Sequence, residues 1–142
     1  MENMVNPGFS RTLMSPLDLQ EGIASLSRGA YFKEASLDMM LSILTESAAQ
    51  MSGVERVSIW ALTNQQQELL CLDLFELSPR RHSKDQRIHA SQYPFYFRAL
   101  RAGSCISADD AYMHPLTAEF AADYLPRHGV TAMLDTPIHI RG

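Results

Sequence analysis

The sequence predicts an α+β fold with a mainly antiparallel sheet flanked by helices. Three observations lead to this class. Apolar residues recur at helical spacing up to residue 52, and then alternate with polar residues over two neighbouring segments that a short polar loop joins. A third observation is the order of the remaining segments, in which short apolar stretches alternate with helical ones. The expected order is helix, helix, strand, strand, helix, strand, helix, strand.

The chain divides into an arm, residues 1–15, and a domain, residues 16–142. Prolines and a glycine interrupt the arm, which we expect to be flexible. A first helix is predicted from Leu17, and Gly29 provides its stop. Its apolar positions step by four and three residues, at Leu19, Ile23 and Leu26.

A second and stronger helix follows, with Ser36 as its predicted N-cap and Ser52-Gly53 as its end. Asp38 lies in its first turn, where the helix dipole favours negative charge. Its apolar positions recur at helical spacing, and we expect them to be core: Leu37, Met40, Leu41, Leu44, Ala48 and Met51.

An antiparallel hairpin is predicted next. Its first strand covers residues 57–62, where Val57, Ile59 and Ala61 alternate with Trp60, and its second covers residues 69–77. In the second strand we expect Cys71 and Asp73 on one face and Leu70, Leu72 and Leu74 on the other. The following basic stretch, residues 78–87, reads as an exposed connection or as an anion or partner site.

The second half continues with a helix that begins near Ser91, the predicted cap, and Pro94, and closes at Gly103. A short strand over residues 104–107 and a loop at Asp109-Asp110 follow. A further helix is expected from Pro115 to Pro126 and Gly129, and a last strand over residues 131–140. Pro137 inside that strand favours an edge position or a bulge.

Composition excludes several classes of protein. The chain has 142 residues, with 12 basic and 16 acidic side chains, so binding to nucleic acid through bulk charge is not expected. No apolar run approaches the roughly 20 residues that span a bilayer, so we expect no membrane insertion. Two cysteines are too few for a disulfide scaffold, and a cytoplasmic location is the simplest expectation.

No strong catalytic motif is present. The phosphate-binding loop, the dinucleotide fingerprint, the nucleophile elbow and the paired-histidine zinc motif are all missing. The five histidines are scattered, so no metal site is predicted. We therefore expect the chain itself not to be an enzyme. One enzymatic alternative stays open, a small redox enzyme that uses Cys71 and Cys105. The other interpretation is that both cysteines are small hydrophobic residues on strands.

Several stretches together resemble a GAF domain, of the kind at the N-termini of bacterial sensor histidine kinases and diguanylate cyclases. They are VERVSIWAL (54–62), ELLCLDLF (68–75), SQYPFYFRALRAGSCISADDA (91–111), HPLTAEFAADYL (114–125) and GVTAMLDTPIHIRG (129–142). The resemblance covers roughly residues 20–142. It implies a GAF/PAS-like antiparallel sheet flanked by helices, with a small-molecule pocket between the sheet and the connecting helices.

Carried over by position, the resemblance implies a ligand site lined by Trp60, Tyr93, Phe97, Asp109, Asp110, Phe120, Tyr124, Met133 and Asp135. From the residues alone, the aromatic side chains read as core or as pocket lining. Asp109 and Asp110 read as caps of backbone N–H groups or as site residues. Burial of Asp135 and Trp60 is expected. The motifs of the cyclic-nucleotide, bilin-binding and sulfoxide-reducing GAF domains are absent, so the ligand and any cofactor are unknown.

The resemblance also implies that a last strand and a closing helix of the family fold are missing from this chain. The strands at 57–62 and 132–140 would then each lose a neighbour, which favours a homo-oligomer. The implied function is a sensory domain that controls a C-terminal output domain in bacterial signal transduction. The alternative is a dimerisation or scaffold module without a ligand.

Overall fold

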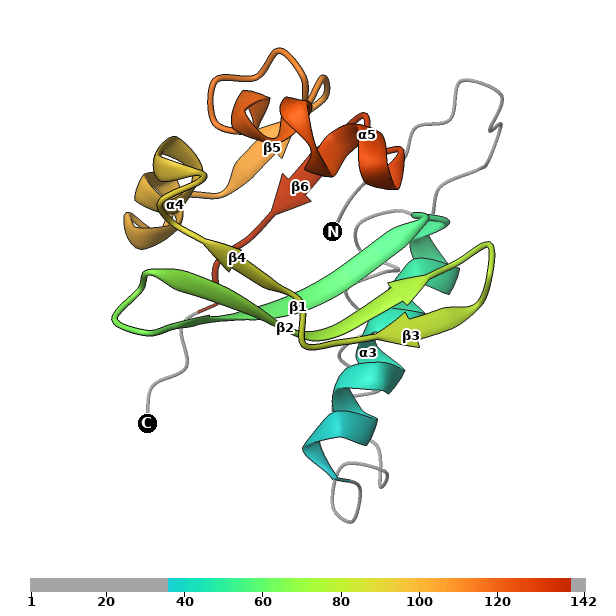
Figure 1. Ribbon diagram of the computed structural model, residues 1–142. Helices are drawn as coiled ribbons and strands as arrows, with labels where there is room; N and C mark the ends of the chain where they lie inside the picture. Colours follow the sequence, from blue (N-terminus) through green and yellow to red (C-terminus); the bar gives the residue numbers. More distant parts are fainter. Residues whose placement is uncertain (1–35, 139–142) are drawn as a thin grey trace.

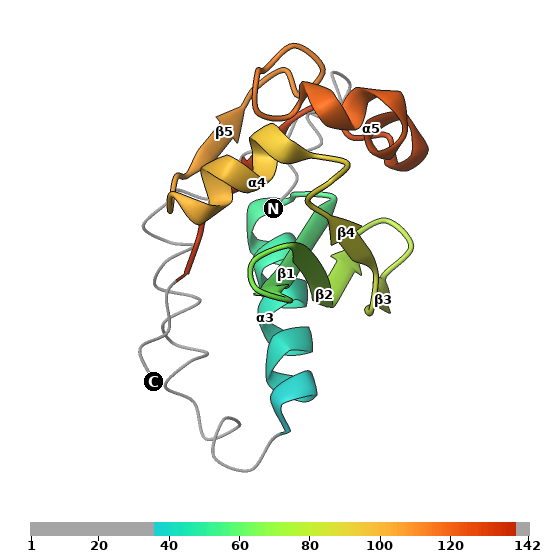
Figure 2. The ribbon, with the colours of Figure 1, turned by 60° about the vertical axis from the view of Figure 1, so that its left-hand side comes forward.

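The computed structural model describes residues 36–138 of the chain. They form a sheet with one long helix on one face and the elements from residue 94 onward on the other (Figure 1). A view turned by 60° keeps the same order of layers (Figure 2). This agrees with the α+β class predicted from the sequence. The arm over residues 1–15, the helix expected from Leu17 and the end of the last strand lie outside the described residues.

Helix α3, Leu37–Ser52, confirms the predicted second helix. The Ser36 hydroxyl accepts a hydrogen bond from the Met39 amide at 3.2 Å, and Gly53 ends the helix in the left-handed conformation at φ 72°. Of the six apolar positions predicted to be core, only Ala48 is buried, and Met40, Leu41, Leu44 and Met51 are half-buried. Leu37 is 62% exposed, because the helix extends past the sheet at its N-terminal end (Figure 1).

Strands β1, Arg56–Thr63, and β2, Glu68–Glu76, pair antiparallel and confirm the predicted hairpin. The register shifts between Ile59 and Trp60. A bulge of this kind changes which face the following side chains meet. Val57 and Phe75 therefore belong to a core cluster under α3, whereas Leu69 belongs to a second cluster on the other face.

The basic stretch expected as an exposed loop instead forms two short strands, β3, Arg81–Ser83, and β4, Arg87–His89. Both pair with β2, on opposite sides of a break at Asp85, whose φ is 73°. Hydrogen bonds between Cys71 and the chain at 85–86 continue the pairing across the break, at 2.8 and 2.9 Å. These residues form strands because β2 is long and largely buried, so the backbone groups on its second edge also need hydrogen-bond partners.

The second half forms short elements: α4, Pro94–Arg101; β5, Ile106–Ala108; a 3₁₀ helix η1, Ala118–Ala122; α5, Tyr124–His128; and β6, Met133–Asp135. The helix expected from Pro115 is thus two short turns, with Pro126 inside α5 rather than at its end. In the stretch where a strand was expected over residues 131–140, the described residues form a strand only over Met133–Asp135. It pairs with β5 in a separate two-stranded sheet and not with β1.

Helix α4 has a cap that sequence reasoning missed. Its N-cap residue is Tyr93, not Ser91, whose hydroxyl lies 2.9 Å from His89 Nδ1. The Glu119 carboxylate accepts hydrogen bonds from the amides of Phe95 and Tyr96, at 3.2 and 3.1 Å. A distant acid therefore satisfies the exposed donors at this helix start and binds η1 to α4.

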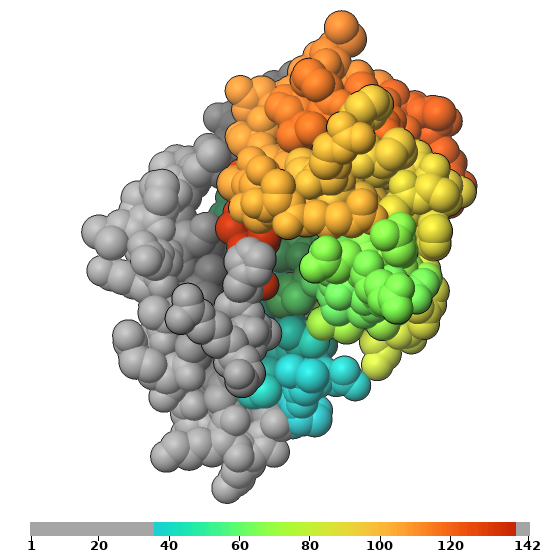
Figure 3. Space-filling model, turned by 90° about the vertical axis from the view of Figure 1, so that its left-hand side faces the viewer, coloured from blue at the N-terminus to red at the C-terminus, as the bar shows by residue number. Residues whose placement is uncertain are grey.

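Two cores result, one on each face of the hairpin. The smaller lies under α3, and the larger fills the space between the hairpin and the second half. Figure 3 shows the second half (yellow to orange) stacked above the hairpin (green), with α3 (cyan) below it. Among residues 36–138, no helix combines the length and apolar character needed to cross a bilayer.

Candidate functional site

The larger core contains an aromatic cluster, which we define as Tyr93, Tyr96, Phe97, Phe120 and Tyr124. Phe120, on η1, is its centre. The ring of Tyr93 stacks on Phe120 with centroids 4.2 Å apart, and the ring of Tyr96 meets it edge-on at 4.8 Å. Tyr124 adds a tilted contact at 5.4 Å. Helix α4 and the turns η1 and α5 thus meet on one ring.

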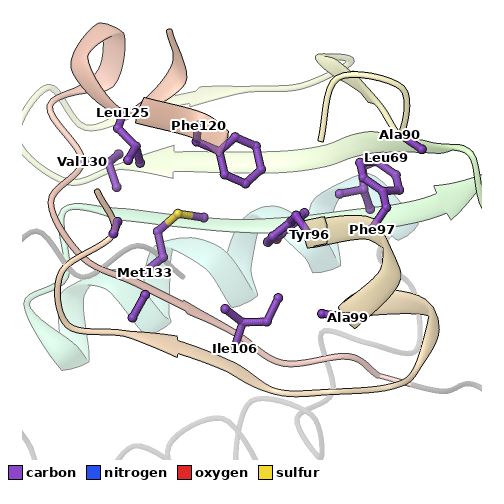
Figure 4. Close-up of a cluster of buried hydrophobic side chains, with 12 residues drawn as sticks. Leu69, Ala90, Tyr96, Phe97, Ala99, Ile106, Phe120, Leu125, Val130 and Met133 are labelled. Atoms are coloured by element: carbon purple, nitrogen blue, oxygen red, sulfur yellow. The ribbon is translucent and has the colours of Figure 1, made fainter. Parts of the chain in front are cut away.

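The hairpin and β6 supply the walls around this cluster. Trp60 and Leu62 of β1 pack against the larger core from the sheet side, and Leu69 of β2 is part of that core. Met133 of β6 reaches toward the same space as Phe120 (Figure 4). The structure therefore brings together the six apolar and aromatic members of the ligand site that the resemblance implied: Trp60, Tyr93, Phe97, Phe120, Tyr124 and Met133.

Polar groups line the edge of the cluster. The Tyr96 hydroxyl donates a hydrogen bond to the Asp135 carboxylate, and Trp60 Nε1 donates to Ser58 Oγ at 2.8 Å. Both Trp60 and Asp135 are half-buried rather than well buried as the sequence predicted. Burial, followed by the charge of Asp123, raises the pKa of Tyr93. The cluster thus offers aromatic faces with a carboxylate at its edge.

Asp109 and Asp110 lie outside the aromatic cluster. Both are exposed in the loop after β5. The Asp110 carboxylate accepts a hydrogen bond from the Tyr112 amide at 3.1 Å, which is the local capping interaction that a loop aspartate commonly makes. Phe95 and Tyr112 are also exposed, so only part of the aromatic-rich second half contributes to the cluster.

The two cysteines differ in environment. Cys71 is buried on β2, and Cys105 is exposed just before β5. Burial and then the negative charge of Asp73 raise the pKa of the Cys71 thiol to about 12. Since the thiolate is the reactive form, Cys71 is poorly suited to redox or nucleophilic chemistry at neutral pH.

On the opposite face of the sheet lies a second group that sequence reasoning missed, the acid–histidine cluster: Thr45, Glu46, Asp73 and His82. Asp73, on β2, is buried under α3 and accepts a hydrogen bond from Thr45 Oγ1 at 2.5 Å. His82, on β3, lies with Nδ1 2.9 Å from Asp73 and Nε2 3.0 Å from Glu46. An aspartate inside the apolar run LCLDLF was the signal that could have found it, because a buried carboxylate requires partners.

This cluster borders an open hollow of about 240 Å³ between α3 and β3. The residues that line it are Asp38, Ser42, Leu72, Asp73, His82, Ser83 and Lys84. An Asp–His pair can activate a nucleophile that contacts the second ring nitrogen of the histidine. Here the second ring nitrogen of His82, Nε2, contacts the Glu46 carboxylate instead. Within residues 36–138, no three His, Cys, Asp or Glu side chains are arranged to hold a metal ion.

The basic side chains of residues 78–87 are exposed, but most of them pair with acidic side chains. Arg81 pairs with Glu76 at 2.8 Å, Lys84 with Asp38 at 3.3 Å, and Arg87 with Glu68. Most of the positive charge of this edge is thereby compensated within the chain, so the structure offers little support for an anion site here.

The fold and the aromatic cluster define an α+β module with a hydrophobic centre between its sheet and its connecting helices. A family model described as "GAF domain" matches residues 36–142. The chain belongs to the GAF domain family, which confirms that part of the resemblance found in the sequence. Comparisons with curated proteins and with solved structures gave no match.

Proposed function

We propose that this chain is the small-molecule-sensing domain of a bacterial signal-transduction protein and controls an output domain C-terminal to it. Membership of the GAF family supports the regulatory part of this proposal, since GAF domains are commonly regulatory modules that bind small molecules. The proposal places the domain in the cytoplasm and assigns no catalytic activity to the chain itself. Turnover that scales with pure protein would contradict that last point.

The observation that carries the proposal is the convergence on Phe120. Side chains from α4, η1 and α5 meet there, and β1 and β6 close the space from two further directions. These elements lie far apart in the sequence, so a ligand bound among them would couple their positions. A sensory domain requires that kind of coupling, because a ligand shifts a conformational equilibrium only through differential contacts.

The chemistry of the cluster favours a small planar ligand. Tyr93 and Tyr124 offer ring faces at the edge of the cluster, and the Asp135 carboxylate offers an acceptor. Side chains fill the centre of the cluster, so binding must move the half-buried residues rather than the buried Phe97 and Phe120. Trp60, Tyr93 and Tyr124 are the residues that we assign to this movement. Asp109 and Asp110 would join the site only if the loop after β5 moved as well.

A homodimer is part of the proposal. Within the described residues, β1 pairs with β2 alone and β6 with β5 alone. Each of these strands therefore leaves one edge without a strand partner among residues 36–138, and such edges favour pairing with another chain. Sedimentation of the full chain at micromolar concentration tests this. A dimer is expected, and a monomer at all concentrations would contradict it.

One observation favours a second candidate, a scaffold module without a ligand. The rings around Phe120 pack at contact distance and already form a filled core. A thermal-shift screen of the full chain against nucleobases, flavins and aromatic acids separates the two functions. A ligand that binds only the folded chain must raise its melting temperature. A reproducible, concentration-dependent rise supports the sensor, and no rise with any compound supports the scaffold.

A further inference from the structure

His82 occupies a position that requires two protons on its ring. Both ring nitrogens lie within hydrogen-bond distance of a carboxylate oxygen, Nδ1 at 2.9 Å from Asp73 and Nε2 at 3.0 Å from Glu46. A neutral imidazole carries only one N–H group, so it can donate to one of these acids and must turn a lone pair toward the other. With both carboxylates ionised, only the imidazolium ion satisfies both contacts.

The surroundings of the ring include charges from every neighbouring element. Asp73 approaches from β2 and Glu46 from α3, while Arg80, before β3, lies 3.8 Å from the Glu46 carboxylate. The ring of Phe75 covers one side, with centroids 4.7 Å apart. Across the hollow, Lys84 and Asp38 pair with each other at 3.3 Å. Partial burial opposes the charged ring, but the hydrogen bonds to Glu46 and Asp73 outweigh it, and the pKa of His82 is raised above its ordinary value.

The two carboxylates are held to different degrees. Asp73 is buried and also accepts the Thr45 hydroxyl at 2.5 Å, so it stays in place whatever the state of His82. Glu46 is more exposed and has other partners, Gln50 at 3.2 Å and Arg80. When His82 loses a proton, it keeps the one that faces the buried Asp73, and the contact with Glu46 is the one that breaks.

We propose that His82 is a proton-dependent latch that fastens the edge strand β3 to helix α3 through Glu46. Protonation closes the latch and deprotonation opens it at Glu46. The inference does not depend on the small-molecule site, which lies on the other face of the sheet. It gives this domain a second input, the pH of its surroundings, acting on the position of α3.

The direction of the pH effect follows from linkage. Because folding raises the pKa of His82 above the value of about 6.5 for an unfolded chain, the latch stabilises the fold fully below that pH. This contribution is lost as the pH rises through the folded-state pKa. Opening of α3 and β3 should therefore become easier on the alkaline side.

The first test is an NMR titration of the histidine rings in the full chain, with His82→Gln used for assignment. We expect His82 to titrate above about pH 6.5 and its pKa to fall in Glu46→Gln, which keeps the side-chain shape. Asp38→Asn is the matched control, since it removes one charge from the same helix without touching His82, and should have the smaller effect. A His82 pKa at or below 6.5, or one unchanged by Glu46→Gln, would overturn the proposal.

The second test is hydrogen exchange of the amides of α3 and β3 at pH 6 and pH 8.5, corrected for intrinsic rates. Protection in the wild-type chain should fall at the higher pH, by up to about tenfold for each unit of the pKa difference measured by NMR. His89 is an exposed histidine on β4, so His89→Gln should show the same decrease in protection. In Glu46→Gln most of this decrease should be absent. Equal falls in Glu46→Gln and the wild-type chain would show that His82 is not a latch.

Discussion

Asp73 is the residue on which the α3 face of the sheet depends most. Its carboxylate is buried and lies within hydrogen-bond distance of the Thr45 hydroxyl, the Ser42 hydroxyl and the His82 ring. A charge in this position is tolerated because each of these groups can donate to it. The same carboxylate therefore joins β2 to both α3 and β3.

We predict that Asp73→Asn lowers the free energy of unfolding by about 2 kcal/mol, because hydrogen bonds to a charged acceptor are lost and an amide donor faces other donors. Urea unfolding measures this. Asp109→Asn is the matched control at an exposed position and should change stability by less than about 0.5 kcal/mol. Equal effects of the two substitutions would show that Asp73 does not hold the cluster.

The cysteines give a second prediction at this scale. A thiol reagent at pH 8 should modify the exposed Cys105 quickly in the folded chain and leave Cys71 unmodified, because Cys71 is buried and its pKa is raised to about 12. Both thiols should react in denaturant. Two fast-reacting thiols in the folded chain would contradict the burial of Cys71.

At the scale of elements, long-range contacts decide what local pattern leaves open. The helix over residues 37–52 and the hairpin could be predicted because cap, periodicity and polar turn agree within one stretch of sequence. The two strands in the basic stretch could not, because only the unpaired edge of β2 makes them strands. The cap of α4 could not be predicted for the same reason, since Glu119 is more than twenty residues away in the sequence.

That cap gives a prediction for an element. Glu119→Ala should cost about 1 kcal/mol, as for loss of an N-cap, and raise hydrogen exchange at Phe95 and Tyr96. Glu119→Gln keeps an acceptor but loses the charge that favours a helix N-terminus, so it should cost less. A Glu119→Ala chain with unchanged exchange at both amides would show that another group caps α4.

At the scale of the whole molecule, the hairpin carries two independent faces. The bulge at Ile59/Trp60 separates the core under α3 from the core around Phe120. The family resemblance implied six aromatic and apolar residues for a ligand site, and all six lie in or against the second core, but their role in binding stays a prediction. The resemblance could not show that their side chains fill the space, because packing depends on distances that no sequence pattern encodes. The acid–histidine cluster was missed, since its members come from three elements.

Binding at the aromatic cluster is the central claim, and the fluorescence of Trp60 reports on it directly. Trp60 is the one tryptophan of the sequence and lies, half-buried, against the larger core that contains the cluster. A planar compound that stabilises the chain should change its emission saturably. Tyr93→Leu removes the ring stacked on Phe120 and should weaken the apparent affinity about tenfold, since an aromatic contact with its buried area contributes roughly 1–2 kcal/mol.

The exposed Tyr112 provides the matched control, and Tyr112→Leu should bind like the wild-type chain. The most direct test of binding at the aromatic cluster is therefore the titration of Trp60 emission in these three chains with the compound that stabilises the fold most. We expect a saturable change in emission, with an apparent affinity that Tyr93→Leu weakens and Tyr112→Leu preserves. Equal affinity in all three chains, or stabilisation with no change in Trp60 emission, would place the ligand elsewhere and contradict the proposed site.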